Sequence, residues 1–360
     1  MANVRLSTVT NAASNTATRD NCVAIRGTGV AASCCAHLLG AAGFSVCHGE
    51  SHRPRIPAML LSEATQALLR DVYGRPDLFH GLFLIDRRIV AWEPGASPVT
   101  LPHHAAVLAE QGLLDRLDSK GGENAANDPA DWTVYASRPL PVPAEQHRFG
   151  SRTASVVAVD LKTPAPPACW IEALECGWLF LIPISAAAGW LISIGGAPAT
   201  LLAESRLIAK QVDGMRVDAN QVEISGATGA ALPAYPGIVD PVCAPGWLAC
   251  GAAALSFDPL CGDGTGNAVR EAILAAAVIR AATAGGDVDR LLSHYRARLI
   301  AGLCRHLELC RSFYIAGKRG PWWDREIAAL EDGIAWCRQT LGTGNAFHYR
   351  LHGFELQAIG

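Results

Sequence analysis

One stretch near the beginning of the chain restricts its fold more than any other, residues 22–50 (CVAIRGTGVAASCCAHLLGAAGFSVCHGE). Residues 22–26 are mostly apolar and predict a short strand, and residues 31–39 are small and apolar and predict a helix. Gly43 ends that helix, and residues 44–47 predict a second strand. A strand, a glycine turn, a helix and a strand in this order are typical of a sheet that binds a dinucleotide.

The glycine turn has the residue types that a bound phosphate requires. Gly27, Gly29 and Ala32 follow a G-x-G-x-x-A spacing. Gly27 permits the tight turn, Gly29 lets a pyrophosphate approach the backbone, and Ala32 lets helix and strand pack closely. Val30 and Ala31, in the first helical turn, offer backbone N–H groups and the partial positive charge of the helix. We therefore predict that a dinucleotide binds here.

An acidic residue follows at the distance expected for a ribose contact. Glu50 comes 18 residues after Ala32, where a carboxylate accepts hydrogen bonds from the adenosine ribose. Arg55 follows, and it either reaches a phosphate or ribose or belongs to a solvated basic loop. This motif by itself leaves FAD and NAD both open, and an ordinary strand–turn–helix is the alternative to either.

Composition admits a large packed core and excludes global disorder, because 50% of the 360 residues are hydrophobic and 18% are charged. This size fits one large domain or two intertwined ones. The net charge is −3 and the 30 Lys and Arg residues form no run, so we expect neither nucleic acid nor an anionic membrane as partner. No apolar run reaches the roughly 20 residues of a membrane helix.

The twelve cysteines are scattered and contain no C-x-x-C pair. With no secretory signal, we expect a cytoplasmic protein that uses cysteine as a small apolar residue and holds no metal. Residues 1–20 are rich in Asn, Thr, Ser and Ala and predict a flexible tail.

The segment after the first unit mixes helical and strand-like patterns. Ser62 is the predicted N-cap of a helix over residues 65–72. Residues 78–101 predict two strands around turn residues, and residues 103–117 predict a helix. His104 lies at the start of that helix, where it is either a contact to the cofactor or a polar helix start.

A β-rich section follows a predicted strand at residues 133–137. Four strand-like runs, separated by Pro, Gly and Ser, indicate an antiparallel sheet inserted into the nucleotide-binding fold. They cover residues 154–161, 169–174, 178–184 and 190–196. Residues 201–212 predict a helix, and the chain beyond Asp287 is predicted to be helical to about Gln339.

A second glycine-rich loop lies about 230 residues after the first. Residues 247–286 predict a strand, a loop with Asp258 and Pro259, and a long helix from about Asn267. The loop contains three spaced glycines, Gly262, Gly264 and Gly266. They let the backbone approach a ligand at the helix N-terminus, a site for developing negative charge. A plain glycine loop is the alternative.

Together these features resemble flavoproteins with the glutathione-reductase-like FAD fold, and among them the flavin-dependent tryptophan halogenases. The resemblance is carried, in the same order, by PRI (54–56), SEAT (62–65), TVYAS (133–137), FGSR (149–152), GWLFLIP (177–183) and CGAAALSFDPLCGDG (250–264). It covers most of residues 22–285. It implies an α/β (α+β) chain with a Rossmann domain that binds FAD, an inserted antiparallel β-sheet substrate domain and C-terminal helices.

The resemblance also implies domain limits and site residues. The FAD-binding domain would comprise residues 21–75, 102–140 and 232–285, the substrate domain residues 76–101 and 141–231, and the helical region residues 286–360. Gly27, Gly29 and Ala32 would hold the pyrophosphate of FAD, and Glu50 its ribose. The residues expected around the isoalloxazine are Asp258, Pro259, Gly262, Asp263, Gly264, Thr265, Gly266 and Asn267. The helix that starts there would stabilise the reduced flavin electrostatically.

The halogenase activity does not carry over. In the halogenases a lysine that captures hypohalous acid follows the SEAT-like string, where this chain has none; its lysines are Lys120, Lys162, Lys210 and Lys318. Their W-x-W-x-I-P motif is reduced to Trp178, Phe180, Ile182 and Pro183. The closer resemblance is to the halogenase-like flavoproteins that help quinoprotein amino-acid oxidases convert a Trp and a Cys into cysteine tryptophylquinone.

That resemblance implies an FAD-dependent monooxygenase that hydroxylates a Trp side chain of a partner quinoprotein oxidase through a flavin hydroperoxide. NAD(P)H bound transiently, or a separate flavin reductase, would supply the electrons. The sequence identifies no acid–base residue. Three alternatives stay open: oxygenation or halogenation of a free small aromatic, a flavoprotein that chaperones the oxidase without turnover, and a flavin oxidase or dehydrogenase.

Overall fold

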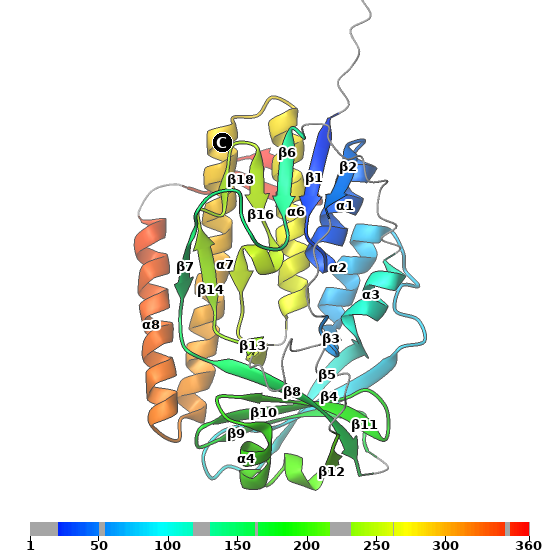
Figure 1. Ribbon diagram of the computed structural model, residues 1–360, viewed down its shortest axis with the longest axis vertical. Helices are drawn as coiled ribbons and strands as arrows, with labels where there is room; N and C mark the ends of the chain where they lie inside the picture. Colours follow the sequence, from blue (N-terminus) through cyan, green and yellow to red (C-terminus); the bar gives the residue numbers. More distant parts are fainter. Residues whose placement is uncertain are drawn as a thin grey trace, which may run out of the picture.

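The structure is a computed structural model that describes residues 21–49, 55–117, 130–162, 165–216, 232–261, 263–342 and 346–359. In Figure 1 a parallel sheet with its helices forms the upper part and a large, mostly antiparallel sheet forms the lower part. The upper sheet has the order β15–β16–β6–β1–β2. Its parallel strands are β1 (Cys22–Arg26), β2 (Ser45–Gly49), β6 (Trp132–Tyr135) and β16 (Trp247–Ala249), and β15 (Cys243–Ala244) is an antiparallel edge strand.

Small side chains let the helices of the upper part pack closely. α1 (Val30–Ala41) follows β1 and packs against α6 (Gly264–Thr283). Cys34 and Cys35 of α1 are fully buried, as is much of the alanine-rich middle of α6. The predicted strand–helix–strand unit is confirmed, and these cysteines serve as small apolar residues.

The lower sheet has the order β12–β8–β11–β10–β9–β4–β5–β3, with β13 paired to β8. Its strands are β3 (Met59–Ser62), β4 (Phe83–Ala91), β5 (Val99–Leu108), β8 (Thr153–Leu161), β9 (Ala168–Leu174), β10 (Gly177–Pro183), β11 (Ala188–Ile194), β12 (Val212–Met215) and β13 (Leu232–Pro233). β9 and β10 are buried throughout, because one face packs on the main core and the other on a smaller cluster that includes α4 (Pro198–Glu204). The predicted antiparallel insert is confirmed.

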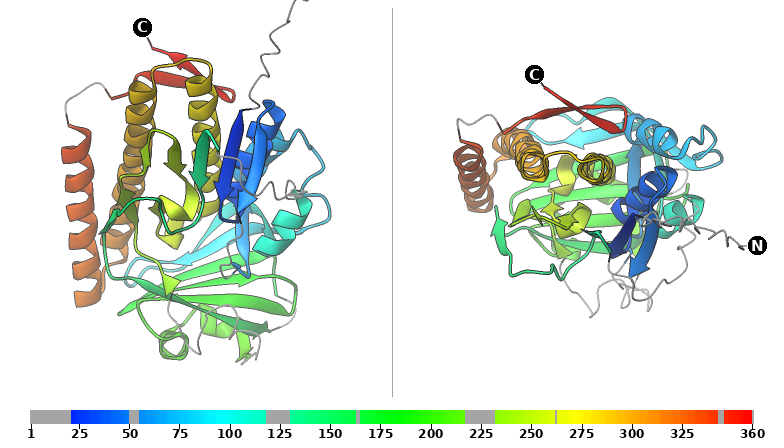
Figure 2. Two further views of the ribbon diagram at one scale, coloured as in Figure 1. Left: turned by 45° about the horizontal axis from the view of Figure 1, so that its top comes forward. Right: turned by 90° about the horizontal axis from the view of Figure 1, so that it is seen from above.

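The remaining elements brace these two parts. β7 (Glu145–Arg148), β14 (Gly237–Asp240) and β17 (Leu255–Ser256) form a small sheet. α7 (Val288–Gly317) and α8 (Pro321–Leu341) pack against each other, which confirms the helices predicted to about Gln339, whereas the strands near the end of the region 286–360 were not predicted. The hairpin of β18 (Tyr349–His352) and β19 (Glu355–Ala358) lies over the end of α6 and the start of α7 (Figure 2). α2 (Glu63–Tyr73) begins after the predicted N-cap Ser62, whose Oγ accepts from the N–H of Thr65 at 3.2 Å.

The predicted helix over residues 103–117 is wrong in its first half. β5 continues to Leu108, and only Glu110–Arg116 is helical (α3). β5 pairs with β4, and its residues 105–108 also pair with β3. Pairing on both sides overrides the helical preference of its alanines. His104 therefore lies in a strand and does not begin a helix.

The predicted helix over residues 201–212 is also largely wrong. α4 ends at Glu204, a 3₁₀ turn covers Ile208–Lys210, and β12 follows. The buried Glu172 carboxylate accepts from the backbone N–H groups of residues 206–208 at 2.8–3.1 Å. Those N–H groups are no longer available to a continuing helix, so the helix ends.

The two parts of the molecule share strands. β5 crosses the expected domain boundary at residue 102, and β3, expected in the FAD-binding domain, belongs to the lower sheet. The division into domains therefore stays a prediction, and residues 1–20 lie outside the described ranges. Within those ranges no helix is long and apolar enough to cross a membrane. They also contain no group of three or more His, Cys, Asp or Glu residues that could hold a metal ion.

Candidate functional site

The parallel strands of the upper sheet end at one edge, and the segments that follow them touch. The N–H of Ala136, after β6, donates to the carbonyl of Arg26 at 2.8 Å. The N–H of Cys250, after β16, donates to the carbonyl of Tyr135, also at 2.8 Å. β6 and β2 flank β1 on opposite sides, so the strand order reverses here. Sheets of this kind bind ligands at such a point.

The turn after β1 needs glycine for its conformation and for space. Gly27 and Gly29 have φ angles of +117° and +106°. A Cβ on Gly27 would lie 2.6 Å from the backbone nitrogen of Ser137. Gly29 is the N-cap of α1, and among the described residues no side chain caps this helix and none in its first turn is acidic. Its first N–H groups and its dipole are therefore available to an anion.

One short segment contacts both glycine loops. Arg55 donates from Nη1 to Oγ1 of Thr28, inside the first loop, at 3.3 Å. Ten residues on, Thr65 donates from Oγ1 to Oδ1 of Asp263, in the second loop, at 2.7 Å. The two loops, far apart in the sequence, therefore belong to one region of the molecule.

The second loop leads into α6 earlier than expected. α6 begins at Gly264, three residues before the predicted start, so Thr265, Gly266 and Asn267 lie in its first turn. The Thr265 hydroxyl donates to Sδ of Met59 at 3.6 Å. A Cβ on Gly266 would lie 2.7 Å from Oγ1 of Thr65, so glycine lets α2 and α6 approach closely.

For three of the residues expected to contact the cofactor, the described part of the structure gives no contact with either glycine loop. Glu50 and Gly262 lie outside the described residues, so their roles stay predictions. His104 is exposed on β5, and none of the described contacts joins it to either glycine loop.

Asp258 lies in a buried charged network. Its side chain is 2% exposed, and Oδ1 accepts from the N–H of Leu260 at 2.8 Å, which caps the turn Pro259–Cys261. Oδ2 accepts from the Tyr314 hydroxyl at 2.7 Å and lies 2.9 Å from Nε of Arg152. Asp258 therefore stabilises the turn Pro259–Cys261, which leads into the second loop.

Arg152 connects this loop to the C-terminal helices. Its side chain is fully buried, and Nη1 donates to Oε2 of Glu326 on α8 at 2.6 Å. Its guanidinium lies 5.0 Å from the ring centre of Tyr314 on α7. We did not identify Arg152 as a site residue from the sequence, although FGSR was noted as a motif. Its ionic partners, Asp258 and Glu326, lie more than 100 residues away.

The protonation states in this network are set by burial and by neighbouring charges. Burial lowers the pKa of Arg152, but Tyr314, Asp258 and Glu326 outweigh that effect and the pKa is raised overall. Burial and the neighbouring Asp258 raise the pKa of Tyr314 well above its ordinary value. Tyr314 therefore keeps its proton and donates a hydrogen bond to Asp258.

Trp178, which remains from the W-x-W-x-I-P motif, is a core residue. It is fully buried in β10, and its Nε1 donates to the Tyr314 hydroxyl at 3.2 Å. Phe180 and Ile182 point to the same side of β10 and are also buried. The motif therefore packs the lower sheet against α7 and reaches the Asp258 loop through Tyr314.

A second buried carboxyl group supports the segment after β16. The N–H of Gly251 donates to Oε2 of Glu271 at 2.7 Å. Burial raises the pKa of Glu271 to about 8, although the bond from Gly251 lowers it, so the group is mainly neutral at pH 7. Gly251 has φ +57°, and a Cβ there would lie 2.8 Å from Cβ of Ala31. Ala252, where the resembled motif has Asn, is exposed.

A polar pair lies on the core-facing side of the lower sheet. Nη2 of Arg88 is 3.1 Å from Nε2 of His103. Arg88 lies beside Cys169, which packs into the main core. Burial and the nearby Arg88 lower the pKa of His103 to about 4, so its ring is neutral at pH 7 and accepts from Arg88. Arg88 has no carboxylate partner among the described residues, so its guanidinium can bind a substrate oxygen.

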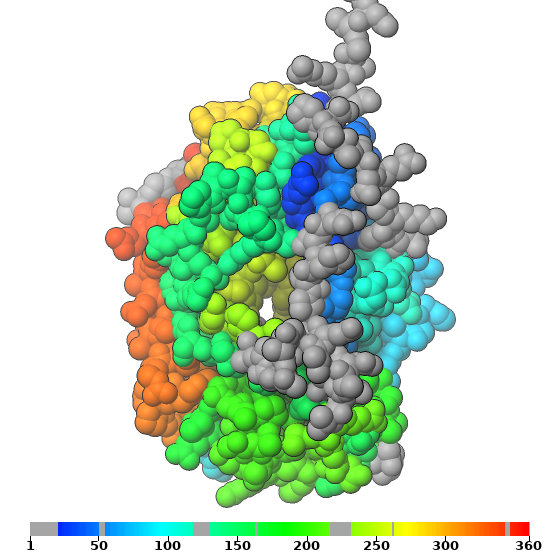
Figure 3. Space-filling view, viewed as in Figure 1, coloured from blue at the N-terminus to red at the C-terminus, as the bar shows by residue number. Residues whose placement is uncertain are grey.

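The face of the molecule drawn in Figure 3 is hollowed near its centre. The hollow lies between the upper and lower parts, and yellow-green residues of the segment around β14 and β16 form its depth. The upper sheet thus contributes a glycine turn with free backbone N–H groups, and the lower sheet contributes a largely apolar face that includes Arg88 and His103.

The sequence matches no protein-family model and none of the curated proteins. The structure, in contrast, matches solved structures of FAD-dependent halogenases and monooxygenases. The chain has the fold of these flavoenzymes.

Among these structures is the peptidyl tryptophan dihydroxylase QhpG, essential for tryptophylquinone cofactor biogenesis, with a TM-score of 0.66 and 22% identity over 84% of this chain and 78% of that one. The flavin-dependent halogenase CmlS gives a TM-score of 0.64 and 20% identity over 89% and 70%. The probable FAD-dependent monooxygenase PqsL of Pseudomonas aeruginosa gives 0.59 and 16% over 86% and 99%. These likenesses confirm the predicted flavoprotein fold.

Proposed function

We propose that this chain binds FAD and acts as a monooxygenase that hydroxylates a tryptophan side chain of a partner protein. One observation carries the proposal. One short segment, from Arg55 to Thr65, contacts both glycine loops, in a fold that is shared, over 84% of the chain, with a peptidyl tryptophan dihydroxylase. The proposed partner is a quinoprotein amino-acid oxidase whose Trp and Cys become cysteine tryptophylquinone.

The two loops fit the two ends of FAD. A pyrophosphate requires N–H donors and close approach to the backbone, and the turn at Gly27 and Gly29 with the uncapped start of α1 offers both. Arg55, bonded to Thr28, adds a positive charge beside that turn. The start of α6 would direct N–H groups at the carbonyl edge of the ring system. Glu50 and Gly262 belong to the proposed site as ribose and ring contacts.

Bound FAD would supply the redox chemistry, namely the activation of dioxygen by the reduced flavin. The residues of the chain have the task of holding the ring, the substrate and the surrounding water in place. Asp258, held by Arg152 and Tyr314, fixes the turn Pro259–Cys261. The core-facing side of the lower sheet would keep bulk water away from the reacting atoms.

The core-facing side of the lower sheet is the proposed substrate side. Arg88 and the neutral His103 provide a hydrogen-bond donor there. Trp190, partly buried on β11, packs against the main core and offers an aromatic surface to an indole. A tryptophan side chain needs such an apolar surface with few polar contacts.

Oxygenation is favoured over halogenation by the sequence of the segment that follows α2. No lysine lies between Gln66 and Ser119, so the side chain that captures hypohalous acid in the halogenases has no counterpart in this segment. NAD(P)H or a separate reductase is the proposed source of electrons.

The test uses the purified, FAD-loaded protein with a chemically reduced flavin pool, dioxygen and the unmodified oxidase subunit. Peptide mass mapping is expected to find one or two added oxygen atoms on a single tryptophan, derived from isotopically labelled dioxygen. A colourless protein that takes up no FAD would remove the flavin assignment. If the protein binds FAD but adds no oxygen to the subunit, the monooxygenase proposal is wrong, and a flavoprotein that chaperones the oxidase without turnover is favoured.

Free tryptophan with bromide is the comparison for that assay. Bromination of free tryptophan would contradict the proposal and support a halogenase. The variant Arg88→Met should retain FAD, because Arg88 lies in the lower sheet, yet it should lower the yield of oxygenated subunit.

A further inference from the structure

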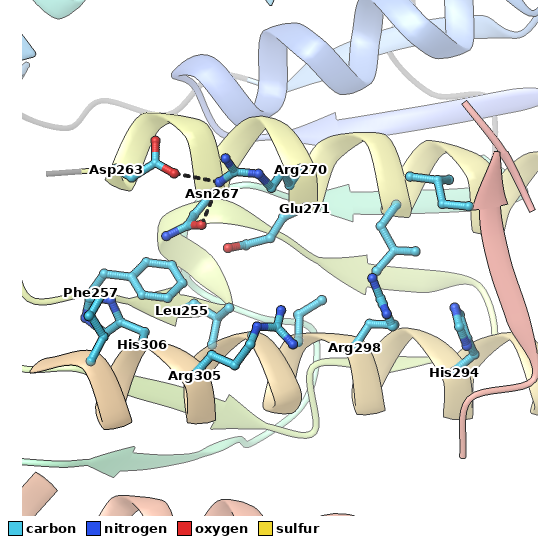
Figure 4. A pocket seen from close by; sticks show the side chains of 15 residues that line it. Leu255, Phe257, Asp263, Asn267, Arg270, Glu271, His294, Arg298, Arg305 and His306 are labelled. Carbon is cyan, nitrogen blue, oxygen red and sulfur yellow. Dashed lines mark hydrogen bonds and ion pairs between the residues drawn. The ribbon is translucent and has the colours of Figure 1, made fainter. Parts of the chain in front are cut away.

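A groove of about 490 Å³ lies between α6 and α7 (Figure 4). One wall is α6 from Asp263 to Leu274, and the other is α7 from His294 to Leu309. α1 packs on α6 from one side and α7 packs on it from another, as Figure 2 shows from above. The groove is therefore separated from the glycine turn by α6.

Two uncompensated positive charges line this groove. Arg270 is paired with Asp263 at 2.7 Å. Arg298 and Arg305 are exposed, and within the described part of the chain neither has an ion pair or a hydrogen bond. Glu271 is mainly neutral at pH 7 because burial raises its pKa to about 8. The groove is therefore electropositive, and an anion would be attracted to it.

The two arginines are placed for two neighbouring anionic groups. They are seven residues apart on α7, which is about two helical turns and about 10.5 Å along one face. Arginine side chains are long enough for both guanidinium groups to converge on a diphosphate between them.

Gly302 lies between these arginines on the same helical face. Glycine inside a helix is destabilising relative to alanine. A Cβ at this position would find only Nη2 of Arg305 within 4 Å, at 3.9 Å. Close packing within the chain therefore does not require this glycine, and its effect is to leave space between the two guanidinium groups.

The two ends of the groove differ in chemistry. At one end the Phe257 ring packs on His306 with centroids 4.9 Å apart, beside the buried Leu255, and this apolar wall suits an aromatic base. At the other end His294 is 1% exposed, and its Nδ1 has no hydrogen-bond partner among the described residues. A ligand hydroxyl would satisfy that buried nitrogen. The distance along α7 between His294 and His306 is about 18 Å.

We propose that this groove binds a nucleotide that carries a diphosphate, with the base against Phe257 and the phosphates on Arg298 and Arg305. ADP and a nicotinamide dinucleotide share this chemistry. The groove shares Asp263 and Asn267, at the start of α6, with the proposed FAD site, whereas Arg298, Arg305 and Phe257 belong to the groove alone.

Calorimetric titration of the FAD-loaded protein with ADP, NADPH, adenosine and inorganic phosphate tests the proposal. ADP or NADPH should bind at least about tenfold more tightly than adenosine or phosphate, because only they fill both the apolar end and the charged middle. Tighter binding of NADPH than of ADP identifies the dinucleotide, and equal binding identifies an adenine nucleotide.

Variants locate the binding. Arg298→Gln with Arg305→Gln should weaken ADP binding by about 100-fold, roughly tenfold for each lost charged contact. Gly302→Leu should remove binding by filling the groove. Arg290→Gln changes an exposed arginine of α7 outside the groove and should leave binding unchanged. The proposal is overturned if neither nucleotide binds, if phosphate binds as tightly as ADP, or if the double variant keeps its affinity. If the protein binds no FAD, the same titration is done on the protein without FAD, and the variants at Arg298, Arg305 and Gly302 still show whether the nucleotide binds in this groove.

Discussion

Arg152 is the residue on which most of the buried charge depends. It lies between Asp258 and Glu326, at 2.9 Å and 2.6 Å, with both carboxylates almost fully buried. A buried ion pair contributes little net free energy compared with an apolar replacement, but removing one partner leaves the other charge uncompensated. Here a single guanidinium pairs with two carboxylates, so its loss should destabilise both the Asp258 turn and the packing of α8.

We predict that Arg152→Met lowers the free energy of unfolding by about 3–5 kcal/mol. Urea denaturation followed by circular dichroism measures this loss. Arg87→Met is the matched control, because Arg87 pairs with Asp86 at the surface, where water screens the pair, so its loss should leave the free energy of unfolding nearly unchanged. Equal losses of unfolding free energy in the two variants would show that the buried network does not contribute more to stability than a surface ion pair.

Glu271 should make stability depend on pH. Its pKa is raised from an ordinary 4.5 to about 8 in the folded protein, mainly by burial. The folded state therefore holds this proton where the unfolded state has released it, so Glu271 should lower stability as pH rises from about 4.5 to about 8.

We predict that Glu271→Gln removes part of that decline. The variant and the wild type should have similar midpoints of thermal unfolding near pH 5, and the variant should be the more stable near pH 8. Glutamine keeps a carbonyl oxygen for the N–H of Gly251, so the backbone contact is preserved. If the difference between the two proteins does not change with pH, Glu271 is not protonated in the folded state.

At the scale of single elements, the sequence correctly predicted the helices and strands whose own residues favour the structure that they adopt in the fold. The strand β1, the helix α1 and the N-cap at Ser62 were predictable because turn chemistry and apolar spacing act over a few residues. β5 was partly missed because its end, Ala105–Leu108, looks helical by itself, and only pairing with β3 and β4 makes it a strand.

The site shows the same division between local and distant information. The glycines that surround a proposed ligand were predictable, since each is needed by its own turn. The buried charged network was not predictable, because its members are far apart in the sequence and no local pattern joins them. Arg152 directly precedes β8, Tyr314 lies on α7 and Glu326 lies on α8. The only feature of the sequence that could have indicated this network was the arginine of the FGSR string, Arg152.

The contact between α1 and the segment after β16 yields a prediction about both packing and ligand binding. Gly251 and Gly353 have the same φ, +57°, but only Gly251 lies against another residue, with a Cβ position 2.8 Å from Cβ of Ala31. Gly353→Ala should cost about 1–2 kcal/mol for the left-handed backbone alone. Gly251→Ala should cost more, because α1 must also move.

FAD titration of both variants completes that comparison. Gly251→Ala should weaken FAD binding, because it displaces the N-terminus of α1 from the phosphates, whereas Gly353→Ala should bind as the wild type does. Similar FAD affinities in both variants would mean that this contact does not set the phosphate site.

At the scale of the whole molecule, the proposed cofactor would join parts of the chain that are far apart in sequence. The first glycine loop follows β1, the second begins α6, and the segment from Arg55 to Thr65 contacts both. The lower sheet takes strands from both sides of the insertion, so the upper and lower parts should not unfold independently. A ligand held by both loops should therefore stabilise the entire fold.

We predict that FAD at 100 times its Kd raises the free energy of unfolding by about 2.7 kcal/mol, because it binds only the folded chain. Differential scanning fluorimetry should then show one transition, shifted upward by several degrees. Riboflavin, which carries only the ring part of FAD, should shift it less, because it does not span the two loops. Two separate transitions, only one of them moved by FAD, would show that the cofactor is held by a single loop and that the upper and lower parts fold apart.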